Sequence, residues 1–460
     1  MAKRQMKNAR VMRREIVDLR GETAALHEEL HERLLQYHLQ LGRLAAVAGS
    51  PQDPPLASRV PLSTVGDHLH ATQVLPAHEP AFVSNGTSDG WLKLASCPAC
   101  HTPERTIVCE WNKLVLLDSA PDEAAWRYDY AVCHGCGIIY ATRRPVGDRY
   151  RYLMDHFEAV IGKSKSSPLL NPHPLTEADR ERYRRLISRG VFVSDHDRDG
   201  GEHIGGVLWD RLEKAEHVEL LGSLLDLKGA RVLEVRSRTG AILDGLRRHY
   251  GCEVYAMPIF ESQQFIVQEL YGIQTTPLID FDRFHITHDE PFDLIVSNHM
   301  FNHAVRLDEF LAAARGALRP NGHLYLYNEI DDSELLGHLT GTSLISTLNP
   351  VHLQVGDQAS LTRAVASAGF EPVFVKGRRG RNFWLMRRTE ESVQISIPEA
   401  ALKQRIDAYR RARDRAVLQA PEHLRPRFVD VWSETVERAV SSGVARFDGK
   451  GALRIVKAQG

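Results

Sequence analysis

The segment Gly229–Gly240, GARVLEVRSRTG, constrains the fold of this chain more than any other stretch. Residues 231–235 form a short apolar run that carries one acid, and residues 241–250 then place apolar side chains at helical spacing. A strand, a tight turn and a helix in this order open a doubly wound α/β domain, whose ligands bind at the carboxyl ends of the strands. Such a turn normally uses glycines to approach a ligand closely, but Arg236 and Arg238 stand at two of the expected glycine positions.

The segments that follow repeat this alternation of strand and helix. Short apolar runs alternate with stretches of helical periodicity, and the connections between them are short. This order predicts a mostly parallel sheet with helices on both faces, closed by an antiparallel pair. The strands expected after the first are residues 253–259, 273–279, 292–297, 323–328, 372–376 and 382–386.

Bulk composition gives no sign of an unusual partner. Among 460 residues, 58 Lys and Arg nearly cancel 59 Asp and Glu, so we expect no bulk attraction to nucleic acid or to a membrane surface. No apolar run approaches the roughly 20 residues that a membrane-spanning helix needs. The basic N-terminus continues into a charged amphipathic segment rather than an apolar one, which indicates a cytoplasmic protein without a secretory signal.

Four of the six cysteines form two Cys-x-x-Cys pairs that are separated by 32 residues. In a reducing compartment this pattern favours metal over disulfides, and the spacing predicts a tetrahedral zinc ribbon. Four thiolates leave no open position for a substrate, so we expect the zinc to be structural. A c-type haem attachment at residues 97–101 would leave the second pair unexplained and would require export. The expected ligands are Cys97, Cys100, Cys133 and Cys136.

Residues 8–48 show apolar side chains at alternating steps of three and four, which is a heptad pattern with one stutter. Such a narrow apolar stripe is buried most simply against its own copy, so we expect a coiled coil that forms a homo-oligomer. The alternative is a helix that packs on the body of the protein. His27 and His31 fit the H-E-x-x-H zinc protease motif, but no third ligand or substrate cleft is suggested nearby.

These signals divide the chain into six expected parts. They are a coiled-coil helix at 1–49, a linker at 50–92, a zinc ribbon at 93–150, a connecting region at 151–206, an α/β domain at 207–388 and a helical C-terminal extension at 389–460.

Two blocks of sequence resemble known families. Residues 136–145, CGIIYATRRP, are similar to the zinc-binding module that precedes many bacterial methyltransferase domains, including those acting on nucleotide sugars. Residues 292–303, FDLIVSNHMFNH, with ALRPNGHL at 317–324, resemble class I S-adenosylmethionine-dependent methyltransferases. The second resemblance extends over residues 207–388 and implies a Rossmann-like fold with an S-adenosylmethionine site.

The resemblance also implies roles for single residues. Glu234 would face the amino acid moiety of the cofactor, Gly240 would cap the helix after the turn, and Asp280 would accept from the adenine amine. Asn298 and His299 would lie at the tip of the fourth strand beside the reactive methyl group. The sequence departs from the family at Arg236 and Arg238, at Met257-Pro258 where an acid usually holds the ribose, and at Asn302 where a glutamate is frequent. The Arg236 side chain would either fill cofactor space or turn outward to bind an anion.

Three histidines are the candidates for a general base, because histidine titrates near neutral pH. His303 has a structural alternative, since it could simply pack at the start of a helix. The candidates are His299, His303 and His352.

Two functions of different class follow from these observations. The first is a methyltransferase acting on a small-molecule or sugar-like acceptor, with an acidic hydroxyl or carbon losing a proton as the methyl group moves. The second is a catalytically inactive methyltransferase-like scaffold that is oligomerised by its coiled coil, because a fold alone does not establish an activity. RNA methylation is disfavoured by the neutral charge.

The coiled-coil prediction can be tested by deleting residues 1–48. We expect light scattering to give an oligomer for the full chain and a monomer for the truncated chain, because the apolar stripe would be lost. Two monomers would contradict the prediction.

Overall fold

The computed structural model describes most of the chain beyond residue 70. The expected coiled coil at 8–48 lies outside the described residues, so it stays a prediction. The described residues are 71–75, 84–88, 90–112, 127–155, 173–188, 206–280, 284–330, 332, 347–348, 351–378, 381–418, 445–447 and 453–455.

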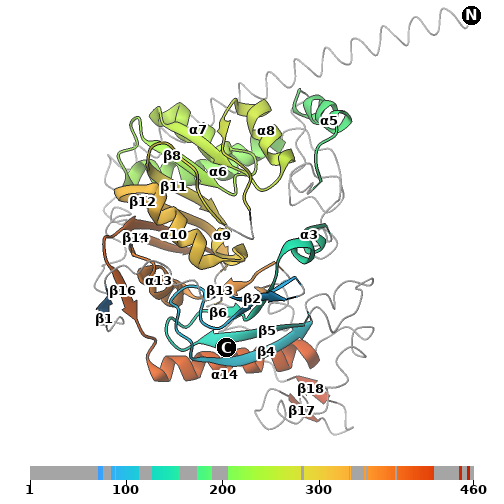
Figure 1. Ribbon diagram of the computed structural model, residues 1–460, viewed down its shortest axis with the longest axis vertical. Coiled ribbons are helices and arrows are strands. Elements are labelled where there is room, and N and C mark those ends of the chain that lie inside the picture. Colours follow the sequence, from blue (N-terminus) through green and yellow to red (C-terminus); the bar gives the residue numbers. More distant parts are fainter. Residues whose placement is uncertain are drawn as a thin grey trace, which may run out of the picture. The chain divides into compact units, whose positions relative to one another are not determined.

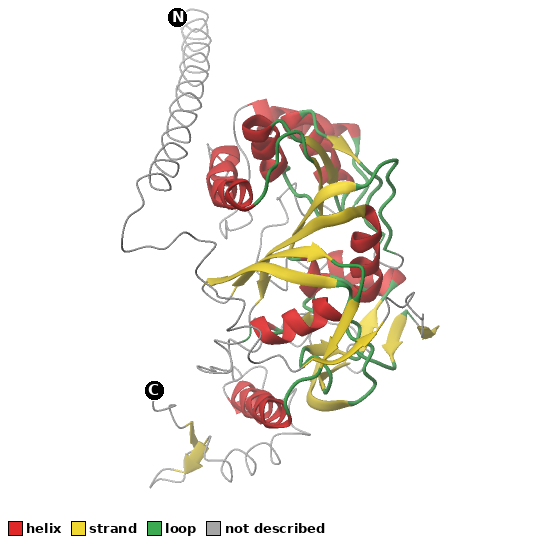
Figure 2. Ribbon diagram, turned by 90° about the vertical axis from the view of Figure 1, so that its left-hand side faces the viewer, coloured by secondary structure: helices red, strands yellow, loops and turns green. Residues whose placement is uncertain are grey.

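The chain forms two compact units, each of which is made of discontinuous segments. The first unit comprises Met1–Arg59, Lys163–Ala230 and Arg238–Thr275. The second comprises Val60–Gly162, Arg231–Ser237 and Thr276–Gly460. Figure 1 labels the elements of both units, and Figure 2 shows the mixture of helices and strands that defines an α/β fold.

The first unit contains helices and a short parallel strand pair. Helix α7 packs on α6, α8 packs on α5, and β9 pairs in parallel with β10. The bounds are α5 Glu177–Ser188, α6 Gly206–Leu224, α7 Ala241–Tyr250, β9 Glu253–Met257, α8 Glu261–Tyr271 and β10 Gln274–Thr275.

The second unit contains five strands of the main sheet in the order β8-β11-β12-β15-β14. The first three strands are parallel, and β15 and β14 are antiparallel to their neighbours. This arrangement confirms the expected Rossmann-like sheet with a closing antiparallel pair. The strands are β8 Arg231–Val235, β11 Phe292–Asn298, β12 Leu318–Ile330, β15 Arg381–Arg388 and β14 Phe370–Arg378, and the helices between them are α9 Met300–His303, α10 Leu307–Ala317 and α13 Gln358–Ser367.

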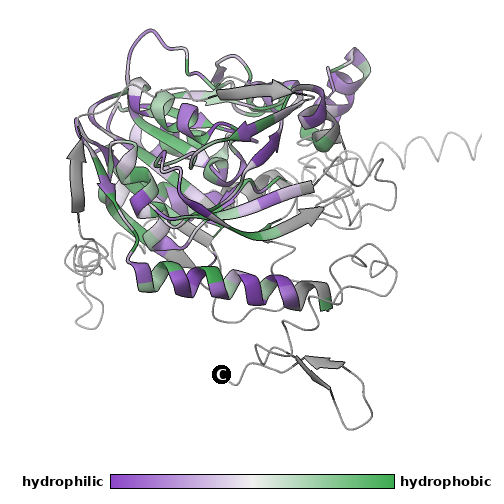
Figure 3. Cartoon of the chain, turned by 60° about the horizontal axis from the view of Figure 1, so that its bottom comes forward, coloured by the Kyte–Doolittle hydropathy of each residue, from purple (hydrophilic) through white to green (hydrophobic). Residues whose placement is uncertain are grey.

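The second unit also contains the segment with the two cysteine pairs. Strands β4, β5 and β6 form an antiparallel sheet, and β13 from the α/β part of the chain adds to its edge. Helix α14 packs along β4 and shows alternating hydrophilic and hydrophobic bands in Figure 3. The bounds are β4 Arg105–Asn112, β5 Arg127–Cys133, β6 Ile139–Ala141, β13 Gln354–Val355 and α14 Glu399–Leu418.

Several short strands lie where the sequence predicted none. The expected linker 50–92 contains β1, β2 and the start of β3, and the expected helical extension 389–460 contains β16, β17 and β18 as well as α14. Strand β1 pairs with β16, more than three hundred residues away, so no local pattern could reveal it. The expected strand 273–279 is reduced to β10. The remaining bounds are β1 Ala71–Leu75, β2 Ser84–Ser88, β3 Trp91–Leu94, β7 Arg143–Pro145, α3 Gly147–Asp155, β16 Ser392–Ile395, β17 Ala445–Phe447 and β18 Leu453–Ile455.

Within the described part of the chain, no helix combines the length and the apolar character needed to cross a membrane.

Candidate functional site

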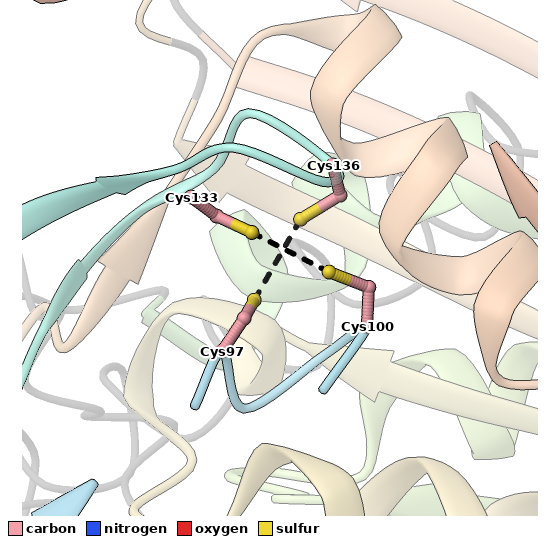
Figure 4. A group of neighbouring side chains, drawn as sticks. All are labelled: Cys97, Cys100, Cys133 and Cys136. Carbon is pink, nitrogen blue, oxygen red and sulfur yellow. Dashed lines mark hydrogen bonds between the residues drawn. The ribbon is translucent and has the colours of Figure 1, made fainter. Parts of the chain in front are cut away.

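The four paired cysteines converge on one point, as the sequence predicted (Figure 4). The Cys97 and Cys136 sulfurs lie 3.7 Å apart and the Cys100 and Cys133 sulfurs 3.4 Å apart. A zinc ion bound at about 2.3 Å from each thiolate would place the sulfurs about 3.8 Å apart, whereas a disulfide needs about 2.0 Å. The arrangement therefore fits a tetrahedral zinc site.

The two cysteine knuckles share one backbone geometry. The Cys97 carbonyl accepts from the His101 amide at 3.0 Å, and the Cys133 carbonyl accepts from the Gly137 amide at 3.1 Å. Both amide donors belong to residues with a left-handed backbone, at φ 59° for His101 and 85° for Gly137. Two equivalent turns aim two sulfurs each at the same centre.

Glycine is required in the second knuckle for steric reasons. A Cβ atom on Gly135 would lie 2.2 Å from the Thr102 hydroxyl oxygen and 3.0 Å from the Cys100 sulfur. The Gly135 amide donates to the Cys133 sulfur at 3.2 Å. This N–H···S bond favours the thiolate, which is the form that binds a metal.

Burial makes four neighbouring thiolates costly without a cation. It raises the pKa of the Cys97 and Cys136 thiols well above the ordinary value, whereas hydrogen bonds from neighbouring thiols lower the pKa of Cys100. A dication would balance the negative charge that the cluster otherwise cannot hold. The chemistry of the donor set therefore agrees with its geometry.

The three candidate histidines also meet, although His352 is far from the other two in sequence. One ring nitrogen of each lies within 4.8 Å of the others, and all three side chains are buried. The Nε2 atoms of His299 and His352 are 3.1 Å apart. His299 follows the last residue of β11, and His303 ends α9, so the cluster lies at the carboxyl end of a parallel strand. Ligands bind at this end in doubly wound folds.

Backbone hydrogen bonds fix the position of His352. The Tyr130 hydroxyl on β5 donates to the His352 carbonyl at 2.9 Å. The next residue, Leu353, accepts from the Ala141 amide at 2.7 Å and donates to the Asn302 carbonyl at 2.8 Å. The cysteine-bearing sheet and α9 therefore hold this segment from two sides.

Asn302, which stands where the resembling family frequently has glutamate, joins α9 to two other segments. Its amide nitrogen donates to the Gln354 carbonyl at 2.9 Å, and its amide oxygen accepts from the Ile330 backbone at 2.7 Å. The side chain is fully buried. Asn302 is thus a positioning residue for the turn that carries His299 and His303.

A buried carboxylate supports the same turn. Glu329 accepts from the backbone amides of Phe301 at 3.1 Å and Asn302 at 3.2 Å. Burial raises its pKa to about 8, against the opposing effects of these hydrogen bonds and of the Arg236 charge. Sequence reasoning missed Glu329, because a single acid at the end of a strand carries no motif.

The carboxylate of Glu234 is buried at the end of β8. It accepts from the Ser237 hydroxyl at 2.7 Å and from the Tyr327 hydroxyl at 3.0 Å. These two bonds orient the carboxylate at the end of the strand.

Arg236 keeps the backbone of a glycine turn. Its φ is 61°, in the left-handed region that glycine adopts without strain and other residues rarely enter. Its guanidinium donates to the Asn298 carbonyl at 3.1 Å and lies 3.5 Å from the His299 carbonyl. Burial lowers its pKa, but arginine remains protonated at neutral pH. The side chain therefore connects the first turn to the tip of β11.

The remaining residues that the sequence predicted for the cofactor site are Gly240, Asp280 and Asn298. Gly240 is the N-cap residue of α7 with φ 82°, and a Cβ there would lie 3.3 Å from Val267, so it permits close helix packing. Asp280 is exposed in the coil after β10. Asn298 ends β11 and is buried.

Arg144 is a second residue that sequence reasoning did not single out as functional. It is fully buried and donates to the Ala304 and Val305 carbonyls at 3.0 and 2.7 Å. Burial lowers its pKa to about 10, which leaves it charged at neutral pH. Strand β7, which follows the second cysteine pair, thus holds the segment that follows His303.

Comparison with known proteins supports the interpretation of the α/β part. Residues 191–374 match the family described as "Methyltransferase domain". No curated protein matches the chain. The chain thus carries a methyltransferase domain.

Solved structures give weaker likenesses. A putative methyltransferase in complex with the Haloferax volcanii Trm112 activator has 14% identity, covering 40% of this chain and 92% of that one at a TM-score of 0.34. An S-adenosylmethionine-dependent methyltransferase from Mesorhizobium loti has 14% identity, with 38% and 97% coverage and a TM-score of 0.32. CalS10, an amino pentose methyltransferase from Micromonospora echinaspora, has 16% identity, with 39% and 91% coverage and a TM-score of 0.31. Likenesses at this level identify no acceptor.

The cysteine site predicts a specific loss of metal. Changing Cys100 to Ser should remove about one zinc equivalent per chain, because a structural site needs all four thiolates. Elemental analysis of the full chain measures this, and Cys109→Ala, at a buried cysteine on β4 outside the cluster, is the matched control. Equal zinc in the two variants would contradict the assignment.

The raised pKa of Glu329 predicts a pH-dependent contribution to stability. The folded state binds the proton more tightly than the unfolded state, so the contribution is greatest below about pH 4.5 and is lost as pH rises towards 8. The slope is at most about 1.4 kcal/mol per pH unit. We expect the free energy of unfolding of the wild type, relative to Glu329→Gln, to fall from pH 5 to 8, as denaturant titrations would measure. A difference that rises with pH would contradict this.

Proposed function

We propose that the chain, which carries a methyltransferase domain, catalyses transfer of a methyl group from S-adenosylmethionine to a small-molecule or sugar-like acceptor. The observation that carries the proposal is the cluster of His299, His303 and His352 beside Asn298, at the carboxyl end of β11. Acceptor activation requires a group that handles a proton near neutral pH, and histidine is the side chain suited to this.

The cofactor would be held by residues around the first turn. The buried Glu234 carboxylate, which the Ser237 and Tyr327 hydroxyls orient, would accept from the amino group of the cofactor. The Ser297 hydroxyl is buried and has no hydrogen-bond partner in the described residues, which suits a site where a polar ligand is bound. Asp280 would contact the adenine amine. Bound S-adenosylmethionine supplies an electrophilic methyl carbon on a positively charged sulfur.

Arg236 is compatible with this site. Its left-handed backbone preserves the path that a glycine turn takes, and its guanidinium is held by the Asn298 carbonyl. We propose that the side chain stabilises the tip of β11 and contributes positive charge next to the carboxylate end of the cofactor.

The chemistry would use the histidine cluster on the acceptor side. The cluster would accept the proton that the acceptor loses. Bound S-adenosylmethionine would supply the methyl group and would leave as S-adenosylhomocysteine. Because the three side chains are buried, the cluster would also keep water away from the reacting atoms.

The zinc would be structural in this proposal. Strands β5 and β6 position the backbone of residues 352 and 353 through the Tyr130 hydroxyl and the Ala141 amide. The zinc ribbon thus supports the histidine cluster without touching the reaction. A cytoplasmic location and a homo-oligomer through residues 8–48 remain our predictions from sequence.

Titration calorimetry with S-adenosylmethionine tests the cofactor site. We expect binding by the full chain, and at least about tenfold weaker binding by Glu234→Ala and Asp280→Ala, which is about 1.4 kcal/mol for each lost contact. Glu391→Ala removes an exposed acid outside the site and should leave the affinity unchanged.

The alternative of an inactive scaffold makes the opposite prediction. Absence of binding at millimolar S-adenosylmethionine, in a chain that is folded by circular dichroism, would favour the scaffold. Binding that is unaffected by both substitutions would refute the placement of the cofactor.

A further inference from the structure

We infer that His299, His303 and His352 form a second metal centre, which binds a divalent first-row cation and leaves a coordination position open. The three-histidine set would take zinc in the first instance, since imidazole nitrogen suits this ion and three protein ligands with one open position are typical of catalytic zinc. This centre is distinct from the ribbon, whose four thiolates leave nothing open.

Distances between the ring nitrogens support a shared cation. Zinc–nitrogen bonds of about 2.0–2.1 Å place two ligands of a tetrahedral ion about 3.3–3.4 Å apart. The Nε2 atoms of His299 and His352 are separated by 3.1 Å, and the ligand nitrogens of all three histidines lie within 4.8 Å of one another. Binding all three nitrogens to one ion would close separations of up to 4.8 Å to about 3.4 Å.

The tautomer of His352 favours the same conclusion. Its Nδ1 atom lies 2.7 Å from the Thr347 carbonyl, which can only accept, so Nδ1 carries the proton and Nε2 presents a lone pair. A ring N–H donated to a backbone carbonyl is the usual support of a metal-binding histidine. The lone pair then points at the Nε2 atom of His299.

The cluster is also pre-formed by its backbone. His299 and His303 are four residues apart around a single helical turn, and His299 is held in the left-handed region at φ 59°. A left-handed backbone is unfavourable for a residue with a side chain, so the surrounding structure must hold it in place. The segments that carry Asn302 and Leu353 do so through the hydrogen bonds between them.

The three histidine rings are packed closely together in a buried site. Their ring centroids are 4.7, 5.0 and 5.1 Å apart, and their exposures are 8%, 6% and 6%. A divalent cation at the cluster would be bound by three neutral imidazole nitrogens together, which spreads its charge over the ligands. A metal site requires several histidines to meet at one point, whereas a general base requires only one. The bound metal therefore explains why three histidine side chains converge here.

This inference deepens the proposed function and, as regards the reaction, rests on it. A cation at the cluster would bind an acceptor through a hydroxyl oxygen in the open position and lower the pKa of that hydroxyl. The substrate class would then be a hydroxyl-bearing acceptor that ionises on the metal near neutral pH and releases its proton to water. The histidines would act as ligands, and this role would replace the general-base role proposed above.

Metal stoichiometry of the full chain tests the site without substrate or cofactor. After equilibration with Zn²⁺ and removal of the free ion, we expect about two equivalents per chain in the wild type and about one in His303→Ala and in His352→Ala. His217→Ala, at a buried histidine of α6 outside the cluster, should retain about two. One equivalent in the wild type, or equal metal in all variants, would overturn the inference.

Cobalt substitution provides a second measurement that needs no variant. Co²⁺ in the ribbon should give intense thiolate charge-transfer absorption, and Co²⁺ at the histidines should add ligand-field bands without it. A spectrum saturated by about one equivalent with thiolate character alone would overturn the inference, even if the histidine variants failed to fold.

The two hypotheses can fail separately. Two metal equivalents without S-adenosylmethionine binding would leave the histidine centre standing and refute the proposed transferase. S-adenosylmethionine binding with about one equivalent would do the reverse.

Discussion

The candidate site depends on the hydrogen bonds that hold residues 352–355 between the cysteine-bearing sheet and helix α9. On one side, β13 pairs with β6 of the cysteine-bearing sheet. On the other side, Leu353 and Gln354 bond to the backbone and the side chain of Asn302. A buried backbone segment must satisfy its polar groups, and here every bond that does so also fixes the distance from His352 to His299. The cysteine-bearing sheet is therefore part of the framework of the site.

Three ionisable side chains surround the short turn that carries His299 and His303. Glu329 caps the amides at the start of α9, Arg236 binds the carbonyl at the end of β11, and Arg144 binds the carbonyls that follow α9. Each ionisable group is thus paired with backbone dipoles of the short turn that carries two histidines. Such dipoles are fixed in place, so the turn is held in one geometry at little cost of reorganisation.

Much of this structure could be predicted from local sequence, but its assembly could not. Periodicity located the parallel strands, and the two Cys-x-x-Cys pairs located the cysteine cluster, because in both cases the signal lies within a few residues. The functions of Asn302, Arg144 and Glu329 depend on backbone partners, which every residue offers, so no residue type marks them. The pairing of β1 with β16 and the meeting of His352 with His299 are products of the tertiary fold alone.

Arg236 shows how a departure from a motif can be interpreted physically. The sequence left open whether its side chain fills the cofactor space or turns outward. In the structure a left-handed backbone keeps the course of a glycine turn, and the guanidinium binds the Asn298 carbonyl at the tip of the neighbouring strand. The backbone of the turn thus keeps its course, and what Arg236 adds is a positive charge at the end of β11. The loss of glycine at this position is thus no evidence by itself for loss of the site.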